Sequence, residues 1–289
     1  MTRNVLGIIG GSGLYELPGL ADTRWIRVDT PWGAPSDELF RGRLGDAELV
    51  FLPRHGRGHR IPPGEVNYRA NIAALKMQGV TDVLSLSAVG SLRADLAPGT
   101  FVIVDQFIDR TVGRQSSFFG RGLVAHVSMA RPVCSRLGAQ VAAVLRGAGV
   151  PQVQGGCYLA MEGPQFSTLA ESQLYRGWNC SVIGMTNMPE AKLAREAELC
   201  YCSVAMVTDF DCWHPAHDAV TVDAIVRVLL ANAATAKGLV AALAASASQD
   251  AAAPACGCRS ALRQALITAP EHRDPALVER LRAIAGRVL

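Results

Sequence analysis

The sequence predicts an α/β fold, in which β-strands and α-helices form packed layers. Short apolar runs bounded by glycine, proline or polar residues alternate along the chain with segments of helical periodicity. The first run, at 5–9, ends in the glycine-rich segment 10–13, which is typical of the opening strand of an α/β domain. Ligands of such folds bind beyond the strand ends, where the loops lie.

The same patterns place the individual elements within one domain spanning 1–289. Helix 66–78 is the clearest, because apolar residues recur along one face and Gly79 supplies a stop. The Ala/Ser-rich region 245–258 predicts a surface connection to a C-terminal helical segment. The expected strands are 5–9, 48–52, 82–87, 100–104, 181–185 and 203–208, and the expected helices are 66–78, 189–197, 222–244 and 275–287.

Composition and charge exclude several classes of function. The 28 Lys and Arg residues against 25 Asp and Glu leave a net charge of +3, too small for the electrostatic footprint of a nucleic-acid-binding protein. The apolar stretch 226–247 is interrupted by Asn232 and Lys237, whereas a membrane span needs roughly 18 consecutive apolar residues. The N-terminus lacks a secretory signal, and eight cysteines in a chain of this length do not form a small disulfide scaffold. We expect a cytoplasmic enzyme without nucleic-acid or membrane partners.

Candidate anion donors follow the first strands. The loop after strand 5–9 offers backbone N–H groups and the Ser12 hydroxyl, although a tight glycine turn without a ligand explains it equally well. A dinucleotide fingerprint is disfavoured, because Glu16 stands where glycine or alanine is required. Arg54 and His55 follow the next strand, where a guanidinium suits bidentate recognition of phosphate, but a solvated basic loop is the alternative.

Two further strand ends carry similar groups. Ser87 and Ala88 close one apolar strand, and the segment 184–186 closes another with Thr186. Together these loops could surround one oxyanion with a few neutral donors and a single positive charge. The pattern favours inorganic phosphate as a substrate.

An acidic pair, Asp209 and Asp211, follows the apolar strand 203–208. Two acids at i and i+2 share a side if the extended conformation continues, and could address one edge of a ligand. An acidic turn in which Asp caps a helix is the alternative. A metal ion is disfavoured, because no further carboxylates or histidines complete a site for a hard cation.

Two Cys-x-Cys pairs, Cys200 with Cys202 and Cys256 with Cys258, raise the question of a zinc site. A site of four thiolates is conceivable, but structural zinc sites more often place two to four residues between ligands. Buried thiols that pack as small hydrophobic groups are the favoured interpretation.

Eight segments, taken in order, resemble the 5′-methylthioadenosine phosphorylase branch of the purine nucleoside phosphorylase family. The resemblance covers roughly residues 5 to 240 and implies one α/β domain with a central mixed sheet flanked by helices. It also implies a homotrimer with sites near subunit interfaces, and phosphorolysis without a metal or cofactor, with phosphate as co-substrate. Pairing of trimers into hexamers stays open. The segments are GIIGGSGL (7–14), RHG (54–56), VNYRAN (66–71), SAVGSL (87–92), VDQFIDRT (104–111), EGPQFST (162–168), GMTNMPEAKLAREAELCY (184–201) and TDFDCW (208–213).

The resemblance implies a role for each matching residue. Asp209 matches the catalytic acid, and Asp211 would accept a hydrogen bond from the 6-amino group of the purine. Some thermophilic relatives carry a C-terminal Cys-x-Cys involved in disulfides, which 256–258 resembles. The phosphate positions are Ser12, Arg54, His55, Ser87, Ala88 and Thr186; the substrate positions are Met185, Asp209, Phe210 and Asp211; Ser167 and Val222 match specificity positions, and His126 and Ile225 match the 5′ pocket.

The implied reaction fixes what Asp209 must do. Cleavage of the N-glycosidic bond builds positive charge on the ribosyl carbon and negative charge on the purine, so protonation of the leaving group helps. Burial and the nearby Asp211 should raise the pKa of Asp209. Because a carboxylate accepts from an amino group, the pair favours 5′-methylthioadenosine, with 6-oxopurine nucleosides and 5′-methylthioinosine as alternatives. A binding protein without turnover and a nicotinamide-dependent oxidoreductase are the competing classes.

Overall fold

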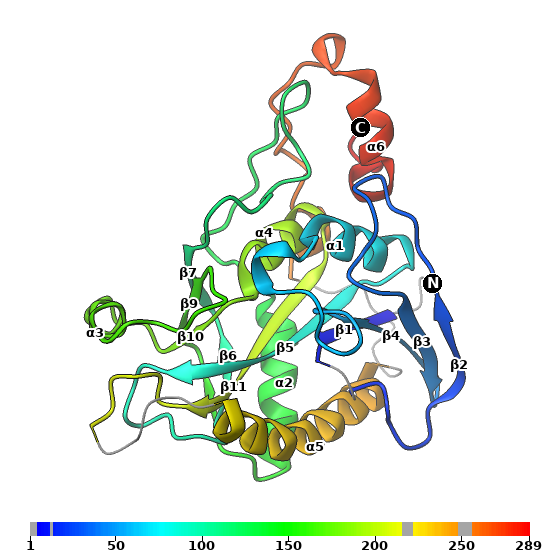
Figure 1. Ribbon diagram of the computed structural model, residues 1–289. Helices are drawn as coiled ribbons and strands as arrows, with labels where there is room; N and C mark the ends of the chain where they lie inside the picture. The colour runs from blue at the N-terminus through cyan, green and yellow to red at the C-terminus, as the bar shows by residue number, and fades with distance from the viewer. Residues whose placement is uncertain (1–4, 12–13, 216–221, 248–255) are drawn as a thin grey trace.

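A mixed β-sheet runs through the centre of the molecule and carries helices on its two faces (Figure 1). The computed structural model describes residues 5–11, 14–215, 222–247 and 256–289. In this part of the chain the strands are β1 (Val5–Gly10), β2 (Ala21–Ile26), β3 (Leu39–Leu44), β4 (Ala47–Pro53), β5 (Asp82–Ser91), β6 (Phe101–Val104), β7 (Gln106–Arg110), β8 (Gln152–Gln154), β9 (Cys157–Met161), β10 (Val182–Gly184) and β11 (Cys200–Asp209).

The sheet forks at β5. This strand pairs in parallel with β1 on one side and with β11 on the other, with Ser87 opposite Ala205. Its last residues, Gly90 and Ser91, pair antiparallel with β10. One branch has the order β2-β3-β4-β1-β5-β10-β9-β7, and the other continues from β11 through β6 to β8. Parallel and antiparallel pairs therefore coexist, which confirms the mixed sheet.

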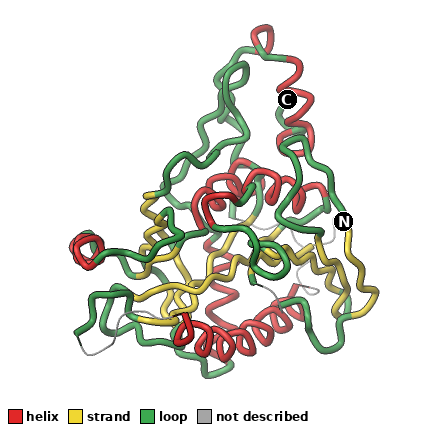
Figure 2. The backbone as a smooth tube through the Cα atoms, viewed as in Figure 1, coloured by secondary structure: helices red, strands yellow, loops and turns green. Residues whose placement is uncertain are grey.

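Helices cover both faces of the sheet (Figure 2). Neighbouring strand residues point to opposite faces. Ile9 and Val83 belong to the apolar cluster beneath α1 and α4, whereas Ile8 and Leu84 belong to the cluster beneath α2 and α5. The helices are α1 (Tyr68–Met77), α2 (Ser135–Gly147), α3 (Leu169–Gly177), α4 (Asn187–Glu196), α5 (Val222–Ala247) and α6 (Pro275–Ala285), with short 3₁₀ helices at Pro63–Glu65, Cys258–Ser260 and Pro270–His272.

Helix α5 holds one stretch, Val228–Ser246, that by length and composition alone could cross a membrane. In the fold this helix lies against β11 and α2. Leu239, Val240 and Leu243 are buried in the apolar cluster on that face of the sheet. The fold buries 33% of the stretch, and Leu230 within it stays 68% exposed.

A lobe projects from the body of the molecule, formed by segment 111–134 and the C-terminal segment with α6 (Figure 1). The two segments are joined by backbone hydrogen bonds from His126 N to Ala265 O and from Ile267 N to Val124 O, both 2.9 Å long. Glu196 at the end of α4 anchors the lobe, since it accepts from Ser117 Oγ and from Phe118 N, both at 2.7 Å.

All ten predicted elements are present, with two boundaries corrected. Strand β5 runs on to Ser91, and α5 continues to Ala247, so the predicted connection 245–258 begins too early. It also ends too late, because Cys258 is buried at the start of a 3₁₀ helix. The sequence reading missed β2, β3, β7, β8, β9, α2 and α3. Of these, β2 is largely exposed and shows no alternation of buried residues.

Candidate active site

The acidic pair lies where β11 ends beside β5. The register between these strands shifts between Val207 and Asp209, which places Asp209 opposite Gly90. A Cβ atom on Gly90 would lie 3.0 Å from Asp209 Oδ1 and 3.3 Å from Asp211 Cβ. Glycine at this position therefore lets both acids approach the strand.

A turn, not an extended strand, brings the two acids together. The Asp211 N–H donates to Asp209 Oδ1 at 2.8 Å, and Asp211 has a φ of 51°, in the left-handed region. This corrects the expectation that an extended backbone aligns the pair. Ser167 lies beside the turn, because its carbonyl accepts from Cys212 Sγ at 3.4 Å.

The contacts of Asp209 are compatible with a protonated carboxyl. Thr208 Oγ1 lies 3.2 Å from the carbonyl of Val89 and 2.7 Å from Asp209 Oδ2. The hydroxyl has one proton and the carbonyl can only accept, so when Thr208 donates to Val89, Asp209 can donate its own proton to Thr208. Burial raises the pKa of Asp209, against the lowering effect of Thr208 and of the Asp211 N–H.

Asp211 is held in the same environment. Burial raises its pKa, Ser172 and Ser167 oppose the shift, and the charge of Asp209 adds to it. Two carboxyls this close do not ionise independently. The pair can therefore keep a proton at a pH where an isolated aspartate has lost it.

Arg54 forms a buried ion pair with Glu190. Arg54 Nε lies 2.9 Å from Glu190 Oε2, and the two side chains are 3% and 2% exposed. Arg54 Nη2 donates to Ser85 Oγ at 2.6 Å and Nη1 donates to Leu86 O at 3.1 Å. The guanidinium fork expected to face phosphate is turned towards Glu190, because a buried charge requires a partner.

A hydroxyl and amide network extends from this ion pair to Ser87. Glu190 Oε1 accepts from Tyr201 OH at 2.8 Å and from Ser85 Oγ at 2.5 Å. Asn187 Nδ2 donates to both of these hydroxyls, at 3.0 Å from Ser85 and 2.9 Å from Tyr201. Ser87 Oγ lies 3.4 Å from Asn187 Oδ1, a long contact that leaves the hydroxyl able to turn towards a ligand.

Two further hydroxyls near Ser87 are buried and available. Thr186 Oγ1 and Tyr158 OH lie close together, with Ser87 beside Tyr158, and neither hydroxyl has a well-formed hydrogen bond among the residues that the structure describes. A buried polar group without a partner is costly, so such groups commonly mark a place where water, an ion or a ligand binds. Thr186 precedes α4, but Met188 has an extended backbone (φ −119°, ψ 131°), so the regular turns of that helix begin only after Met188.

His55 is neutral in this structure. Burial and the charge of Arg54 lower the pKa of His55 to about 4. Its Nδ1 lies 2.9 Å from Ile61 O, and because a carbonyl only accepts, Nδ1 carries the proton. The Nε2 atom is left as an acceptor, suited to the proton of a hydrogen phosphate.

A buried arginine fixes the loop between β10 and α4. Arg114 Nη1 donates to the carbonyls of Met185 at 2.7 Å and Met188 at 2.8 Å. Its Nε lies 3.1 Å from Glu162, which in turn accepts from Val112 N at 2.7 Å. Met185, expected at the ribose, is thereby held against the segment that follows β9.

The remaining predicted residues are more scattered. Phe210 packs against Trp213 and His214, with ring centroids 6.0 and 4.7 Å apart. His126 is exposed on the lobe, away from the strand ends. Ser12 lies outside the described residues, as do the side chains of Val222 and Ile225. Ala88, half-buried on β5, follows Ser87 directly.

Four structurally central residues were missed by the sequence reading: Glu190, Asn187, Arg114 and Tyr158. Glu190 and Asn187 fall inside the segment GMTNMPE, so a carboxylate four residues after the predicted anion loop was the available signal. For Arg114 and Tyr158 the sequence offers no comparable signal, because only the fold brings the residues around them together.

Comparisons with known proteins identify the family of this chain. A model of the phosphorylase superfamily matches residues 5–245. S-methyl-5′-thioadenosine phosphorylase of Rhodospirillum rubrum is 61% identical over 285 residues, covering 99% of this chain and 97% of that protein. The enzyme of the same name from Cereibacter sphaeroides is 60% identical over 287 residues, covering 99% of both chains.

Solved structures give the same result. Methylthioadenosine phosphorylase from an antarctic soil metagenomic library superposes with a TM-score of 0.92 at 45% identity, covering 98% of this chain and 99% of that one. Methylthioadenosine phosphorylase from Schistosoma mansoni in complex with adenine has a TM-score of 0.83 at 38% identity, covering 89% and 96%. This chain therefore belongs to the phosphorylase superfamily.

Proposed function

We propose that this protein is an S-methyl-5′-thioadenosine phosphorylase, which converts 5′-methylthioadenosine and phosphate into adenine and 5-methylthioribose 1-phosphate. The relatives that carry this name support the substrate. The observation that carries the proposal is the turn joining Asp209 and Asp211, both with a raised pKa, beside a group of buried hydroxyls. The product chemistry belongs to purine and methionine salvage, and the proposal calls for no cofactor beyond inorganic phosphate.

The spacing along β5 suits a nucleoside. Ser87 and Gly90 are three residues apart, or about 10 Å along a strand. Phosphate would lie near Ser87 and Thr186, where neutral donors are available, and the purine near Asp209, which faces Gly90. The ribosyl group would then bridge the two, next to Met185.

The residues at each end would divide the chemistry. Asp209 would donate its proton to the departing purine while Asp211, as a carboxylate, accepts from the 6-amino group. Phosphate, held by Ser87, Thr186 and backbone N–H groups, would stabilise the positive ribosyl carbon and then bond to it. Arg54 would contribute its positive charge from the core beneath the phosphate site and would make no bidentate contact with the phosphate.

The exposed lobe supports an assembled enzyme. His126 projects from the lobe and makes its backbone contact to Ala265, not to the strand ends. In the proposed cytoplasmic homotrimer, the lobe would reach the neighbouring subunit and bring His126 to its 5′ pocket. Val222 and Ile225 of α5 complete the proposed pocket, and the proposal includes no nucleic-acid or membrane partner.

Adenine release tests the proposal. The purified enzyme is given 5′-methylthioadenosine with and without phosphate, in parallel with 5′-methylthioinosine, adenosine and inosine, and each free base is quantified. We expect release that depends on phosphate and favours the methylthio substrate, with Asp209→Asn reducing kcat by about 10²–10⁴-fold. Preference for a 6-oxopurine would overturn the substrate, and cleavage without phosphate would overturn phosphorolysis.

A further inference from the structure

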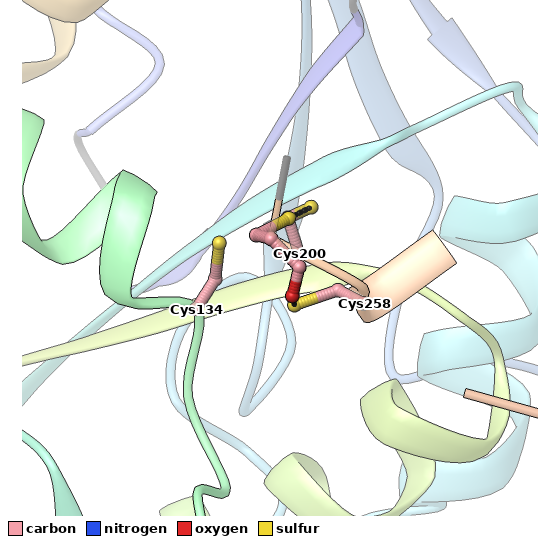
Figure 3. Close-up of side chains that lie close together, drawn as sticks. Cys134, Cys200 and Cys258 are labelled. Atoms are coloured by element: carbon pink, nitrogen blue, oxygen red, sulfur yellow. Dashed lines mark hydrogen bonds between the residues drawn. The ribbon is translucent and has the colours of Figure 1, made fainter. Parts of the chain in front are cut away.

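Four cysteines from three distant parts of the chain meet at the end of the sheet opposite the acidic pair. The four Sγ atoms, of Cys134, Cys200, Cys256 and Cys258, all lie within 4.8 Å of one another. Figure 3 shows Cys134, Cys200 and Cys258 pointing towards a common centre. Cys200 begins β11, nine residues before Asp209, which is about 30 Å along an extended strand. The cluster is therefore separate from the proposed active site.

The backbone holds each of the four cysteines in place. Cys134 is the residue before α2, and its N–H donates to Tyr201 O at 2.7 Å. Cys200 N donates to Thr81 O at 3.0 Å, within the sheet. Gly257 has a φ of 66°, a left-handed conformation that reverses the chain between Cys256 and Cys258. This turn allows two neighbouring cysteines to face one centre.

The sulfur positions fit a tetrahedral metal site. With a Zn–S distance of about 2.3 Å, tetrahedral geometry separates the sulfur atoms by about 3.8 Å. Cys200 Sγ and Cys256 Sγ are 3.4 Å apart, and all six separations are below 4.8 Å, so shifts of less than about 1 Å would complete a tetrahedron. The four cysteines are free thiols at non-bonded distances, not disulfides.

The surroundings suit the negative charge of such a site. Four thiolates around a divalent zinc ion leave a net charge of −2, which needs compensation when buried. Arg195 Nη1 lies 3.6 Å from Cys258 Sγ, as a donor to the sulfur. Arg136 and Arg259 both pair with Asp82, which stands opposite Cys200 in the sheet. Arg195 thus donates to the cluster directly, and the two positive charges of Arg136 and Arg259 exceed the single charge of Asp82 beside it.

Burial also favours a structural metal. Cys134, Cys200 and Cys258 are buried, and Cys256 is half-buried and supplies a route for the ion. The Cys-x-Cys pairs alone suggested Cys202 as a fourth ligand, but its place in the cluster is taken by Cys134. Cys202 lies two residues further along β11 in the same apolar cluster but outside this group of sulfur atoms, which the spacing of the two pairs could not indicate.

We propose that Cys134, Cys200, Cys256 and Cys258 bind one zinc ion as a structural site. Binding replaces the thiol protons, which pass to solvent, and leaves four Zn–S bonds without any redox step. The ion would fasten the start of the C-terminal segment to β11 and to the start of α2. Because that segment forms the lobe, the metal would stabilise the lobe without entering the reaction.

Metal content tests this site directly. The full-length protein, expressed with zinc in the medium and purified under reducing conditions, should contain about one zinc per chain by mass spectrometry. Cys258→Ala and Cys134→Ala should each lower the zinc content by at least about fivefold. Cys202→Ala is the matched control: it removes a buried thiol from the same strand as Cys200 and should retain zinc.

Cobalt provides a readout that does not depend on activity or on folding yield. Reconstitution of the metal-free full-length protein with Co²⁺ should give the intense visible bands of tetrahedral cobalt–thiolate, absent in Cys258→Ala and present in Cys202→Ala. Removal of zinc by a chelator should lower the Tm by about 5 °C or more, while the rate of the proposed phosphorolysis at low temperature stays unchanged.

Three results would overturn the site. They are four reactive thiols with no metal in protein grown with zinc, disulfide-linked peptides joining these cysteines in reduced preparations, and equal zinc loss in Cys202→Ala. Failure of the proposed phosphorolysis would leave the metal content unchanged, so the two proposals fail separately.

Discussion

Glu190 turns the guanidinium of Arg54 into the core, 2.9 Å from its own carboxylate, and both side chains are almost fully buried. An arginine that follows a strand end beside an anion loop would, if exposed, present its fork to phosphate. Here Ser85 and Leu86 take its other donors. The anion site therefore depends mainly on neutral hydroxyls and backbone N–H groups, with the ion pair as a rigid support beneath it.

Breaking this ion pair should be costly. Glu190→Gln leaves the Arg54 charge buried without a counter-ion, so we expect a loss of about 3–5 kcal/mol in the free energy of unfolding and a Tm lower by about 10 °C. Inorganic phosphate should restore more of the Tm in the variant than in the wild type, because the freed guanidinium can bind the anion. Both effects are measured by thermal unfolding with and without phosphate.

The matched control for Glu190→Gln is Tyr201→Phe. It removes the hydrogen bond to the same carboxylate and the one that Tyr201 accepts from Asn187 but keeps the charge pair, at a cost of about 1–3 kcal/mol. A Tm for Glu190→Gln no lower than that of Tyr201→Phe would show that the ion pair contributes little.

The anchor of the lobe should make stability depend on pH. Burial raises the pKa of Glu196 from 4.5 to about 7, against the lowering effect of Phe118 N and Ser117. Between these pH values the folded state keeps a proton that the unfolded state has lost, so stability is full below about pH 4.5 and falls as the pH rises to 7. The difference is about 3 kcal/mol at most.

Glu196→Gln, which stays uncharged, should remove this slope. The measurement is the Tm of the wild type and of the variant between pH 5 and pH 7.5, compared as a difference so that other titrating groups cancel. Parallel pH dependence in the two proteins would contradict a neutral, buried Glu196.

Much of the fold was predictable because local patterns carry it. The apolar strands β1, β4, β5 and β11 are buried on both faces, which makes them continuous apolar runs in the sequence. The exposed strand β2 carries no such pattern and was missed. Strand ends were found through their glycines and hydroxyls, which is why the anion donors and the acidic pair were named from sequence.

Pairings between distant residues could not be predicted in the same way. Glu190 is 136 residues from Arg54, and Cys134 is 66 residues from Cys200. Local periodicity does not predict which two buried charges, or which two thiols, will lie next to each other in the fold. The turn at Asp211 was only an alternative in the sequence analysis, because a positive φ at an aspartate depends on the hydrogen bond that its N–H makes to Asp209.

The proposed acid should impose an upper pH limit on catalysis. Asp209 must be protonated to act, and burial raises its pKa above the usual value for aspartate. We therefore expect kcat/KM for 5′-methylthioadenosine to be level at low pH and to fall about tenfold per pH unit above that pKa. Since phosphate itself titrates near neutrality, the informative comparison is with Asp209→Asn, whose residual rate should lack the part of the fall that belongs to the carboxyl. If the two enzymes have identical pH profiles, the fall in kcat/KM at high pH comes from the titration of phosphate alone.

Asp211 should decide which purine is preferred, and Asn is the substitution that tests it. Asparagine tolerates the left-handed backbone found at this position, so Asp211→Asn can keep the turn and its N–H contact to Asp209. The asparagine amide can donate a hydrogen bond to a 6-oxo group. The aspartate carboxylate cannot, because the carboxylate and the 6-oxo oxygen are both acceptors. We expect the ratio of kcat/KM for 5′-methylthioadenosine over 5′-methylthioinosine to fall by at least about tenfold, mostly through slower use of the amino substrate. Asp211→Ala is the control, because it removes the carboxylate without supplying a donor and should slow both substrates. An Asn variant that slows both substrates equally would place Asp211 outside the contact with the 6-substituent.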